Sequence, residues 1–396
     1  MIKTHLEIDL DILESNAKEL VKKYSEYDYI FGVLKSNAYG HGEYVVNAFI
    51  RGGINYICVS YIEEALRVRK YSKNIPILCM QPILLDDLKD AYDNNITLTV
   101  DNMDYLDSLI KKCNKNIKVH LKVDSGMNRL GFKTKEEIRE AYDKIVACKY
   151  IELEGIYTHL ATIGLFDNKY DKQVEKFKDA LSLINIKKVP IIHFGSSAIT
   201  IGHEKLPFVN GARFGIALYG FNVTLNISTL GLKNKIRKLR NTYYQKKYSL
   251  SPVISNVELN LKPAISMKTR IIEIKDVPKG DFIGYGASYQ AKEDMKIAIL
   301  PVGYYDGIGS KNNGRYVLIN NKKYYMVGQM SMNMMIIKID DSVKINDEVT
   351  LLGDSITPGT FASFDNGTRI ATLLNLGKTN DHYYIKKGKV VYKEGE

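Results

Sequence analysis

Several features that mark other classes of protein are missing from this sequence. No apolar run approaches the roughly 20 residues that a membrane-spanning helix requires. Residues 1–9 carry acidic side chains early and contain no continuous apolar segment, unlike a secretory signal peptide. The sequence also has no internal repeat and no low-complexity tract. It therefore predicts a soluble, cytoplasmic protein.

Cysteine is scarce: the four cysteines include no Cys-x-x-Cys pair. This usage indicates neither a disulfide framework nor a zinc site, so we expect no metal. Cys58 and Cys79 lie in apolar, strand-like runs, where we expect buried thiols.

Acidic residues are outnumbered by basic ones, 45 to 56, which gives a formal net charge of +11. The densest basic segment is 233–247, and such a segment could contact nucleic acid or a membrane surface. No RNA- or DNA-binding signature surrounds it. We therefore interpret 222–262 as an irregular, solvated insertion and expect no nucleic-acid or membrane partner. The positive charge would instead help attract an anionic ligand, such as a cofactor that carries phosphate.

The first part of the chain alternates apolar runs with amphipathic segments. Continuous apolar runs of this length are typical of parallel strands that are buried on both faces. We expect eight such strands: Tyr29–Leu34, Ile54–Ser60, Ile75–Cys79, Ile96–Val100, Ile117–Val123, Leu153–Thr158, Ile191–Gly195 and Ala212–Leu218.

The intervening segments read as helices, most clearly after Thr134. Thr134 and Glu137 have the spacing of a capping box, and apolar residues then recur at helical intervals from Ile138 to Cys148. Alternating strands and helices in this number indicate an α/β fold, a (β/α)8 barrel, with a doubly wound sheet as the alternative.

After Gly220 the pattern changes to alternating stretches without a long helical pattern. Asn320-Asn321, between two such stretches, is a hairpin signal. We expect a mostly β second domain with strands in Ile265–Ile274, Met295–Val302, Tyr316–Ile319 and Tyr324–Val327. The predicted organisation is a barrel over 9–221, a linker or insertion over 222–262, and a β-rich domain over 263–396 that also includes residues 1–8.

Lys35 follows the first expected strand and precedes a small, polar, Gly-rich turn. A lysine at a strand end can be partly desolvated, which lowers its pKa and frees its amine to attack a carbonyl. Enzymes that use pyridoxal phosphate (PLP) need such a lysine for their Schiff base. On spacing alone, however, an ordinary surface lysine is the more frequent explanation.

Further polar residues follow other expected strands, and catalytic groups of a barrel lie at the C-terminal ends of its strands. Barrel enzymes commonly bind phosphate with the loops after the seventh and eighth strands. Ser197 and the Gly215-Ile216 backbone fall in those loops. The other polar residues at strand ends are Arg129, His159, Ser196 and Arg213.

Seven segments resemble, in the same order, motifs of the alanine racemase family. The run from Phe31 to Gly42 is similar to the family's PLP-lysine motif, and His120 to Phe132 to its long fifth-strand motif. One such motif alone would be weak evidence for the resemblance, whereas seven motifs in the same order are strong evidence. The other five are 155–161, 213–220, 284–289, 303–307 and the looser match 328–333.

The resemblance implies a homodimeric, PLP-dependent isomerase that interconverts L- and D-alanine and supplies D-amino acids for peptidoglycan. Lys35 and Tyr285 would be the two bases, with Tyr285 reaching the neighbouring subunit's barrel. Arg129, the Met332 backbone and Asn375 would contact the substrate. A lysine at the Lys122 position is often carbamylated in the family. The cofactor would be held by Lys35, Tyr39, His159, Ser197, Arg213, Gly215 and Ile216.

Some positions depart from the family's pattern. Asn375 stands where alanine racemases carry an active-site tyrosine. The serine/alanine racemase domains associated with vancomycin resistance have a similar asparagine. Asparagine is smaller and both donates and accepts hydrogen bonds, so it could admit the hydroxymethyl group of serine. We therefore expect alanine racemisation with appreciable serine racemisation. Other departures are Gly195-Ser196, Asn333 and Gly164.

Two other classes remain open at this stage. PLP-dependent decarboxylases of basic amino acids use a similar barrel, and a non-enzymatic PLP-binding protein would share the lysine. The Tyr285 motif and the order of barrel and β domain resemble racemases more closely.

Overall fold

The computed structural model describes residues 4–164, 168–223, 232–254 and 257–394. The chain divides into two compact units. The barrel unit comprises Glu14–Lys35 and Val46–Lys262. The β unit comprises Met1–Leu13, Ser36–Val45 and Pro263–Glu396. The chain therefore leaves the barrel unit directly after Lys35 for ten residues and then returns to it.

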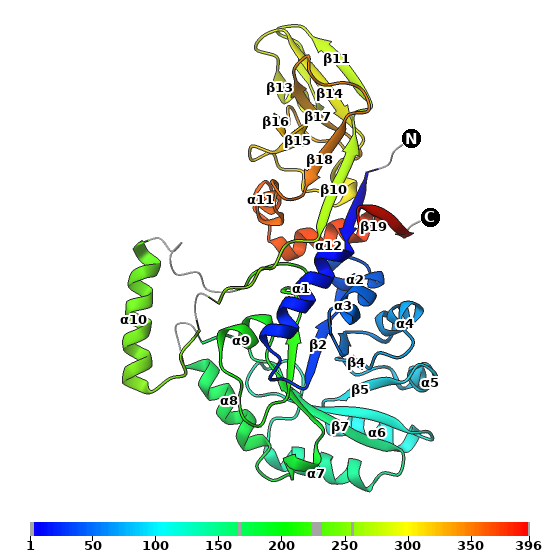
Figure 1. Ribbon diagram of the computed structural model, residues 1–396, viewed down its shortest axis with the longest axis vertical. Helices are drawn as coiled ribbons and strands as arrows, with labels where there is room; N and C mark the ends of the chain where they lie inside the picture. Colours follow the sequence, from blue (N-terminus) through cyan, green and yellow to red (C-terminus); the bar gives the residue numbers. More distant parts are fainter. Residues whose placement is uncertain (1–3, 165–167, 224–231, 255–256, 395–396) are drawn as a thin grey trace. The chain divides into compact units, whose positions relative to one another are not determined.

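Eight parallel strands close into a barrel, which confirms the predicted fold (Figure 1). Each strand pairs with the next, and β9 completes the ring by pairing with β2. Each predicted apolar run overlaps one of these strands, although β7 and β9 begin before their runs and β9 ends at Phe214, short of the predicted Leu218. They are β2 (Tyr29–Val33), β3 (Tyr56–Val59), β4 (Ile77–Cys79), β5 (Ile96–Val100), β6 (Ile117–Val123), β7 (Ile151–Thr158), β8 (Ile191–Phe194) and β9 (Gly211–Phe214).

Helices connect the barrel strands. Thr134 caps α7 as predicted: its side chain accepts from the Glu137 N–H group, and Glu137 completes the capping box. Ile138, Ala141 and Ile145 form the buried stripe of this helix. The helices are α1 (Leu10–Lys23), α3 (Val46–Arg51), α4 (Ile62–Tyr71), α5 (Leu88–Asp93), α6 (Met103–Lys112), α7 (Lys135–Ala147), α8 (Lys169–Ala180) and α9 (Ser197–Gly202), with short 3-10 turns η1 (Glu43–Val45), η2 (Leu85–Asp87) and η3 (Ile186–Lys188).

The prediction that 222–262 is irregular was wrong in part, because α10 (Leu232–Tyr248) lies within it. Leucine, lysine, arginine and glutamine have good helix propensity, and this outweighs the polar composition. Exposed apolar side chains recur along the helix at helical spacing, at Leu232, Ile236, Leu239 and Tyr243. Among the described residues, every helix is too short or too polar to cross a bilayer.

The described residues of the β unit form three sheets. The largest has the order β16-β15-β18-β10-β1-β19-β20, the second β11-β14-β17, and the third pairs β12 with β13. Their bounds are β1 (His5–Asp9), β10 (Ile265–Arg270), β11 (Glu273–Val277), β12 (Phe282–Ile283), β13 (Tyr289–Gln290), β14 (Met295–Leu300), β15 (Tyr316–Ile319), β16 (Lys322–Tyr325), β17 (Met335–Ile339), β18 (Glu348–Leu352), β19 (Asp381–Lys386) and β20 (Lys389–Glu394).

The hairpin at Asn320-Asn321 is confirmed. Both residues have positive φ, 50° and 63°, and β15 pairs antiparallel with β16. Two central residues with positive φ match the twist of the strands, and asparagine tolerates this conformation.

Two expectations for the β unit were wrong. The run Ile265–Ile274 is not one strand, because β10 and β11 belong to different sheets. The unit also contains helices, α11 (Pro358–Ser363) and α12 (Arg369–Thr379). Thr368 caps α12 by accepting from the Ala371 N–H group. We expected no helix there because no long helical pattern was found, but Leu373 and Leu376 bury one face of α12.

Candidate active site

Lys35 begins a short turn, α2 (Lys35–Gly40), immediately beyond the C-terminal end of β2. It is half-buried, and burial, followed by the charge of Arg129, lowers the pKa of its ammonium group. Its Nζ has no hydrogen-bond or ion-pair partner within the part of the chain that the structure describes. These properties are those of a lysine that is poised to react as a free amine.

The turn after Lys35 is left-handed. Residues 36–39 all have φ between 49° and 54°. This conformation costs about 1–2 kcal/mol per residue, so the turn must be held by other contacts. Asn37 Nδ2 donates to the Gly377 carbonyl at 3.1 Å, and His382 Nε2 donates to the Gly40 carbonyl at 3.0 Å. The β unit therefore fixes the segment that carries Tyr39.

Arg213 is buried in β9, at 2% exposure, and is held by backbone and imidazole acceptors. Its Nη2 donates to the carbonyls of Thr158 at 2.8 Å and Gly195 at 2.6 Å. Its Nη1 donates to His193 Nδ1 at 2.6 Å. No acceptor for its Nε–H group lies among the described residues, which leaves this donor for a ligand.

His159 comes directly after β7 and lies beside Arg213, with Nδ1 at 3.3 Å from Arg213 Nη2. Burial, followed by the charge of Arg213, lowers the pKa of His159 to about 3. The imidazole is therefore neutral at physiological pH and adds no positive charge.

Ser197, at the start of α9, meets the loop after β9, as the phosphate-site prediction requires. Its Oγ accepts from the Gly215 N–H group at 2.9 Å. Neither the Ser197 hydroxyl hydrogen nor the Ile216 N–H group has an acceptor in the described segments. Two donors at this edge are thus available to an anion.

Lys122 and Arg129 add further positive charge to the same barrel. The pKa of Lys122 is lowered to about 8, mainly by burial and to a lesser extent by the charges of Arg129 and Arg213. Lys122 Nζ lies 5.4 Å from the centre of the Tyr157 ring, and Arg213 Cζ lies 5.3 Å from the same centre. Arg129 is exposed in the loop between β6 and α7. Four cationic side chains therefore influence one another here, which suits a ligand with phosphate and carboxylate groups.

The remaining predicted residues lie in the β unit, where adjoining loops bring their segments together. Tyr285 begins the turn η4 (Tyr285–Ala287) and is 66% exposed. The preceding Gly284 has φ 78°, and a Cβ there would lie 2.9 Å from the Gln329 nitrogen. The motif at 284–289 therefore lies directly against the motif at 328–333.

The loop around η5 (Tyr304–Asp306) connects Met332 with α12. The Tyr305 N–H group donates to the Met332 carbonyl at 2.9 Å, whereas the Met332 N–H group has no acceptor among the described residues. A Cβ on Gly307 would lie 2.7 Å from the Asn375 carbonyl oxygen. Met332 and Asn375 are thus neighbours of one loop, and Asn375 is exposed on α12.

Comparison with known proteins gives two matched domains, one over most of the barrel and one in the β unit. The N-terminal domain of alanine racemase matches residues 8–223, and the C-terminal domain matches residues 264–384. The chain belongs to the alanine racemase family. It is accordingly a PLP-dependent isomerase that acts on a small amino acid. Residues 224–263, which include α10, lie outside both matched domains.

Individual relatives support this assignment. Alanine racemase of Borreliella burgdorferi is 34% identical over 387 residues, 96% of either chain. That of Halalkalibacterium halodurans is 34% identical over 361 residues, 89% of this chain and 86% of the relative. The crystal structure of alanine racemase from Bacillus anthracis with bound L-Ala-P has a TM-score of 0.83 and 28% identity, covering 99% of this chain and 97% of that one.

The residues present fit PLP. An alanine racemase needs an amine to carry the cofactor, a donor for its ring nitrogen and donors for its phosphate. Lys35 Nζ, Arg213 Nε–H, and the Ser197 and Ile216 donors lack protein partners in the described segments. The observed excess of positive charge matches an anionic cofactor.

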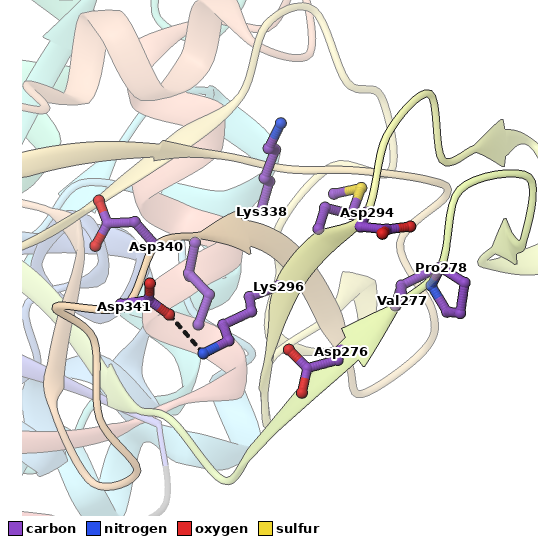
Figure 2. Close-up of a pocket in the computed structure, with 10 residues that line it drawn as sticks. Asp276, Val277, Pro278, Asp294, Lys296, Lys338, Asp340 and Asp341 are labelled. Carbon is purple, nitrogen blue, oxygen red and sulfur yellow. Dashed lines mark hydrogen bonds and ion pairs between the residues drawn. The ribbon is translucent and has the colours of Figure 1, made fainter.

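Sequence reasoning missed the groups that hold Arg213, namely His193 and the carbonyls of Thr158 and Gly195. His193 lies within the expected strand Ile191–Gly195, and its place in an otherwise apolar strand was the available signal. The β unit also has a cavity of about 550 Å³ lined by Asp276, Asp294, Lys296, Lys338, Asp340 and Asp341, among others (Figure 2). No predicted site residue lines that cavity, so the family's chemistry is not assigned to it.

Proposed function

We propose that this alanine racemase interconverts L- and D-alanine with two bases, Lys35 and Tyr285, and supplies D-alanine for peptidoglycan. The observation that carries the proposal is the convergence of cationic side chains around Lys35, whose own amine lacks a partner in the described chain. When bound, PLP withdraws electrons from the substrate's α-carbon and makes its hydrogen acidic.

The chain's own residues divide the remaining work. Lys35 carries the cofactor, Arg213 donates to its ring nitrogen, and His159 lies beside its ring. Tyr39, Ser197, Gly215 and Ile216 hold its phosphate. Arginine stays protonated at any physiological pH, so Arg213 donates a hydrogen bond without giving up its proton.

Racemisation removes the α-hydrogen as a proton from one face and returns a proton to the other. The lowered pKa of Lys35 favours an amine that can accept that proton. The Tyr285 hydroxyl serves the opposite face. Because both groups exchange protons, either enantiomer can be the starting material.

Arg129 and the Met332 N–H group bind the substrate carboxylate. Lys122 supports Arg129 after carbamylation. Its neutral amine attacks carbon dioxide, forms a nitrogen–carbon bond and releases one proton to solvent. The resulting carboxylate orients the Arg129 guanidinium. A pKa of about 8 leaves about a tenth of Lys122 neutral at pH 7.

The enzyme works as a cytoplasmic homodimer in which Tyr285 serves the neighbouring subunit's barrel. The adjoining loops around Tyr285 expose several large side chains: Phe282, Tyr285, Tyr305 and Met332 are 64%, 66%, 63% and 53% exposed. Large exposed apolar groups gathered on one face are typical of an interaction surface.

Serine is a second, minor substrate. Asn375 is exposed, and its side chain both donates and accepts hydrogen bonds. Asn375→Tyr should lower the ratio of the serine rate to the alanine rate severalfold. An unchanged ratio would exclude Asn375 as a determinant of specificity.

The deciding measurement follows D-alanine and D-serine formation from the L-enantiomers by chiral chromatography with added PLP. Lys35→Ala should abolish both reactions, whereas the exposed Lys187→Ala should change neither. Release of carbon dioxide would indicate a decarboxylase instead. A PLP absorption band without turnover of any amino acid would indicate a binding protein.

A further inference from the structure

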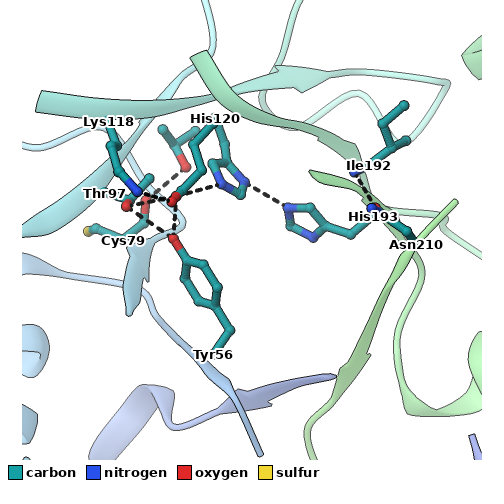
Figure 3. A network of polar contacts seen from close by, with 10 residues as sticks. Tyr56, Cys79, Thr97, Lys118, His120, Ile192, His193 and Asn210 are labelled. Atoms are coloured by element: carbon teal, nitrogen blue, oxygen red, sulfur yellow. Dashed lines mark hydrogen bonds and ion pairs between the residues drawn. The ribbon is translucent and has the colours of Figure 1, made fainter. Parts of the chain in front are cut away.

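A chain of buried side chains leads from Arg213 through the barrel interior. Figure 3 shows the part of it formed by His193 and His120. Arg213 Nη1 lies 2.6 Å from His193 Nδ1, and His193 Nε2 lies 2.9 Å from His120 Nδ1. His120 Nε2 lies 3.2 Å from Glu154 Oε2. Both imidazoles have no exposed surface. The three residues beyond Arg213 come from β6, β7 and β8.

The two ends of the chain fix the direction of every hydrogen bond in it. Arginine only donates, so His193 Nδ1 must accept and its Nε2–H group must donate to His120 Nδ1. His120 then donates from Nε2 to Glu154. Both histidines are therefore neutral and protonated on Nε2.

Glu154 completes the chain as an acceptor. Burial alone would raise its pKa, but hydrogen bonds from His120, Lys118 and Tyr56 lower the pKa to about 2. Lys118 Nζ lies 2.8 Å from Oε1, and the Tyr56 hydroxyl lies 2.5 Å from Oε2. An ionised carboxylate has no proton to donate, so it cannot reverse the chain.

The surrounding strands leave room for the imidazoles in one orientation. A Cβ on Gly155 would lie 2.6 Å from His120 Cε1, and a Cβ on Gly211 would lie 2.7 Å from the Cβ of His193. His193 is stacked between Phe31 and Tyr157, with ring centres 4.6 and 4.7 Å away. The rings therefore cannot rotate freely to adopt other hydrogen bonds.

Arg213 has no carboxylate within ion-pairing distance among the described residues. A buried charge without a counter-charge is costly. The two neutral imidazoles link Arg213 to Glu154, which provides negative charge at the far end of the chain.

We propose that Glu154, His120 and His193 are positioning residues that fix the orientation of the Arg213 guanidinium and keep its Nε–H group directed at the cofactor. This inference rests on the proposed role of Arg213. If His193 instead carried a proton on Nδ1, two donors would face each other and Arg213 would have to turn away. The chain thus prevents the one protonation pattern that disrupts the site.

The test compares a variant that breaks the chain with one that preserves its polarity. Glutamine retains a hydrogen-bond acceptor and a donor, as a neutral imidazole does, whereas leucine has neither. We expect His120→Leu to lower kcat about 10–100-fold, with KM for alanine changed less than about threefold, as for other residues that orient a ligand-binding group. His120→Gln should stay within about fivefold of the native enzyme.

Nitrogen NMR of the histidine rings in cofactor-free protein gives a readout that is independent of activity. Both rings should be neutral and protonated on Nε2, and His193 should become a mixture of tautomers in His120→Leu. PLP should also bind more weakly to that variant. His203→Gln is the control, since His203 is a buried barrel histidine whose Nε2 donates to the Ile163 carbonyl, outside this chain.

Three results would overturn the proposal: Nδ1-protonated rings in the native protein, equal activity of the leucine and glutamine variants, or unchanged PLP affinity in His120→Leu. If His120→Leu does not fold, His193→Leu and His193→Gln provide the same comparison. A native enzyme without racemase activity would refute the proposed function alone, because the NMR result does not depend on turnover.

Discussion

Replacement of Gly377 by alanine sets two physical effects against each other. Gly377 lies in α12, and alanine is favoured over glycine in a helix by about 0.5–1 kcal/mol. A Cβ at this position, however, would lie 2.2 Å from the Gly40 carbonyl oxygen and 2.3 Å from its Cα. Both atoms are backbone, so no flexible side chain can move aside.

The overlap with the Gly40 backbone outweighs the gain in helix propensity. Relief of the overlap requires a shift of about 1 Å between α12 and the turn that follows Lys35, and such overpacking typically costs about 1–3 kcal/mol. The net loss of stability should therefore be about 1–2 kcal/mol, after the gain in helix propensity. The shift also weakens the hydrogen bond from Asn37 to the Gly377 carbonyl, 3.1 Å in the native protein.

The same displacement should also reduce catalytic activity strongly. A misplacement of about 1 Å at a reacting group can cost about 100-fold in rate. We therefore expect Gly377→Ala to lower kcat/KM for L-alanine by about 10–100-fold and to weaken PLP binding. Chiral chromatography and PLP absorbance measure these effects, and urea unfolding measures the stability.

Gly359→Ala is the matched control, because Gly359 is also in a helix of the β unit and a Cβ there would have its nearest neighbour at 3.6 Å. This control should be neutral or slightly stabilising. If Gly377→Ala behaved in the same way, with native activity, the close contact with Gly40 would have no functional importance.

Three further predictions concern ionisable groups. Asp365→Asn should destabilise the β unit by about 3 kcal/mol in urea unfolding, because it removes the 2.6 Å ion pair of the buried Arg315, whereas Asp86→Asn, at an exposed pair, should have no effect. Burial lowers the pKa of His41 to about 3, so below about pH 6.5 the unfolded state binds a proton that the folded state does not. This residue alone should therefore lower the free energy of unfolding by about 2 kcal/mol between pH 7 and pH 5, and His41→Asn should reduce that pH dependence. Removal of carbon dioxide should raise KM for alanine severalfold in the native enzyme but not in Lys122→Ala, and bicarbonate should restore it.

The barrel could be predicted from the sequence because its strands are buried on both faces. Such strands read as continuous apolar runs, and the run Tyr29–Leu34 contains β2. The hairpin at Asn320-Asn321 and the helix capped by Thr134 were predictable for a different reason. Their signals are local, and each depends on the conformational preference of a few neighbouring residues.

The missed elements depend on contacts between residues distant in the sequence. The left-handed turn after Lys35 is unfavourable by itself and is held by Gly377 and His382, more than 300 residues away. The helix α12 was missed because no long helical pattern marks it, and it contains Gly377, where a Cβ would lie 2.2 Å from the Gly40 carbonyl oxygen. Glycine has low helix propensity, but at this position a contact between residues distant in the sequence requires it.

The candidate site shows the same division. Lys35, His159 and Arg213 fall at expected strand ends, which barrel topology brings together, but their roles were inferred from the resemblance and not from this placement alone. The hydrogen bonds of His193 to Arg213 and His120 could not be predicted, because an isolated strand does not reveal which side chains meet inside a closed barrel.

Two separate sets of contacts thus position Lys35 and Arg213, the two residues proposed to hold the cofactor. Lys35 is fixed on one side by β2 and on the other by a turn held by α12 and His382. Arg213 is fixed by acceptors within the barrel unit alone. A change in α12 therefore acts through the lysine, whereas a change in the histidine chain acts through the arginine. Residues 36–45 belong to the β unit whereas Lys35 belongs to the barrel unit, so the backbone before and after Lys35 is held by contacts within different units.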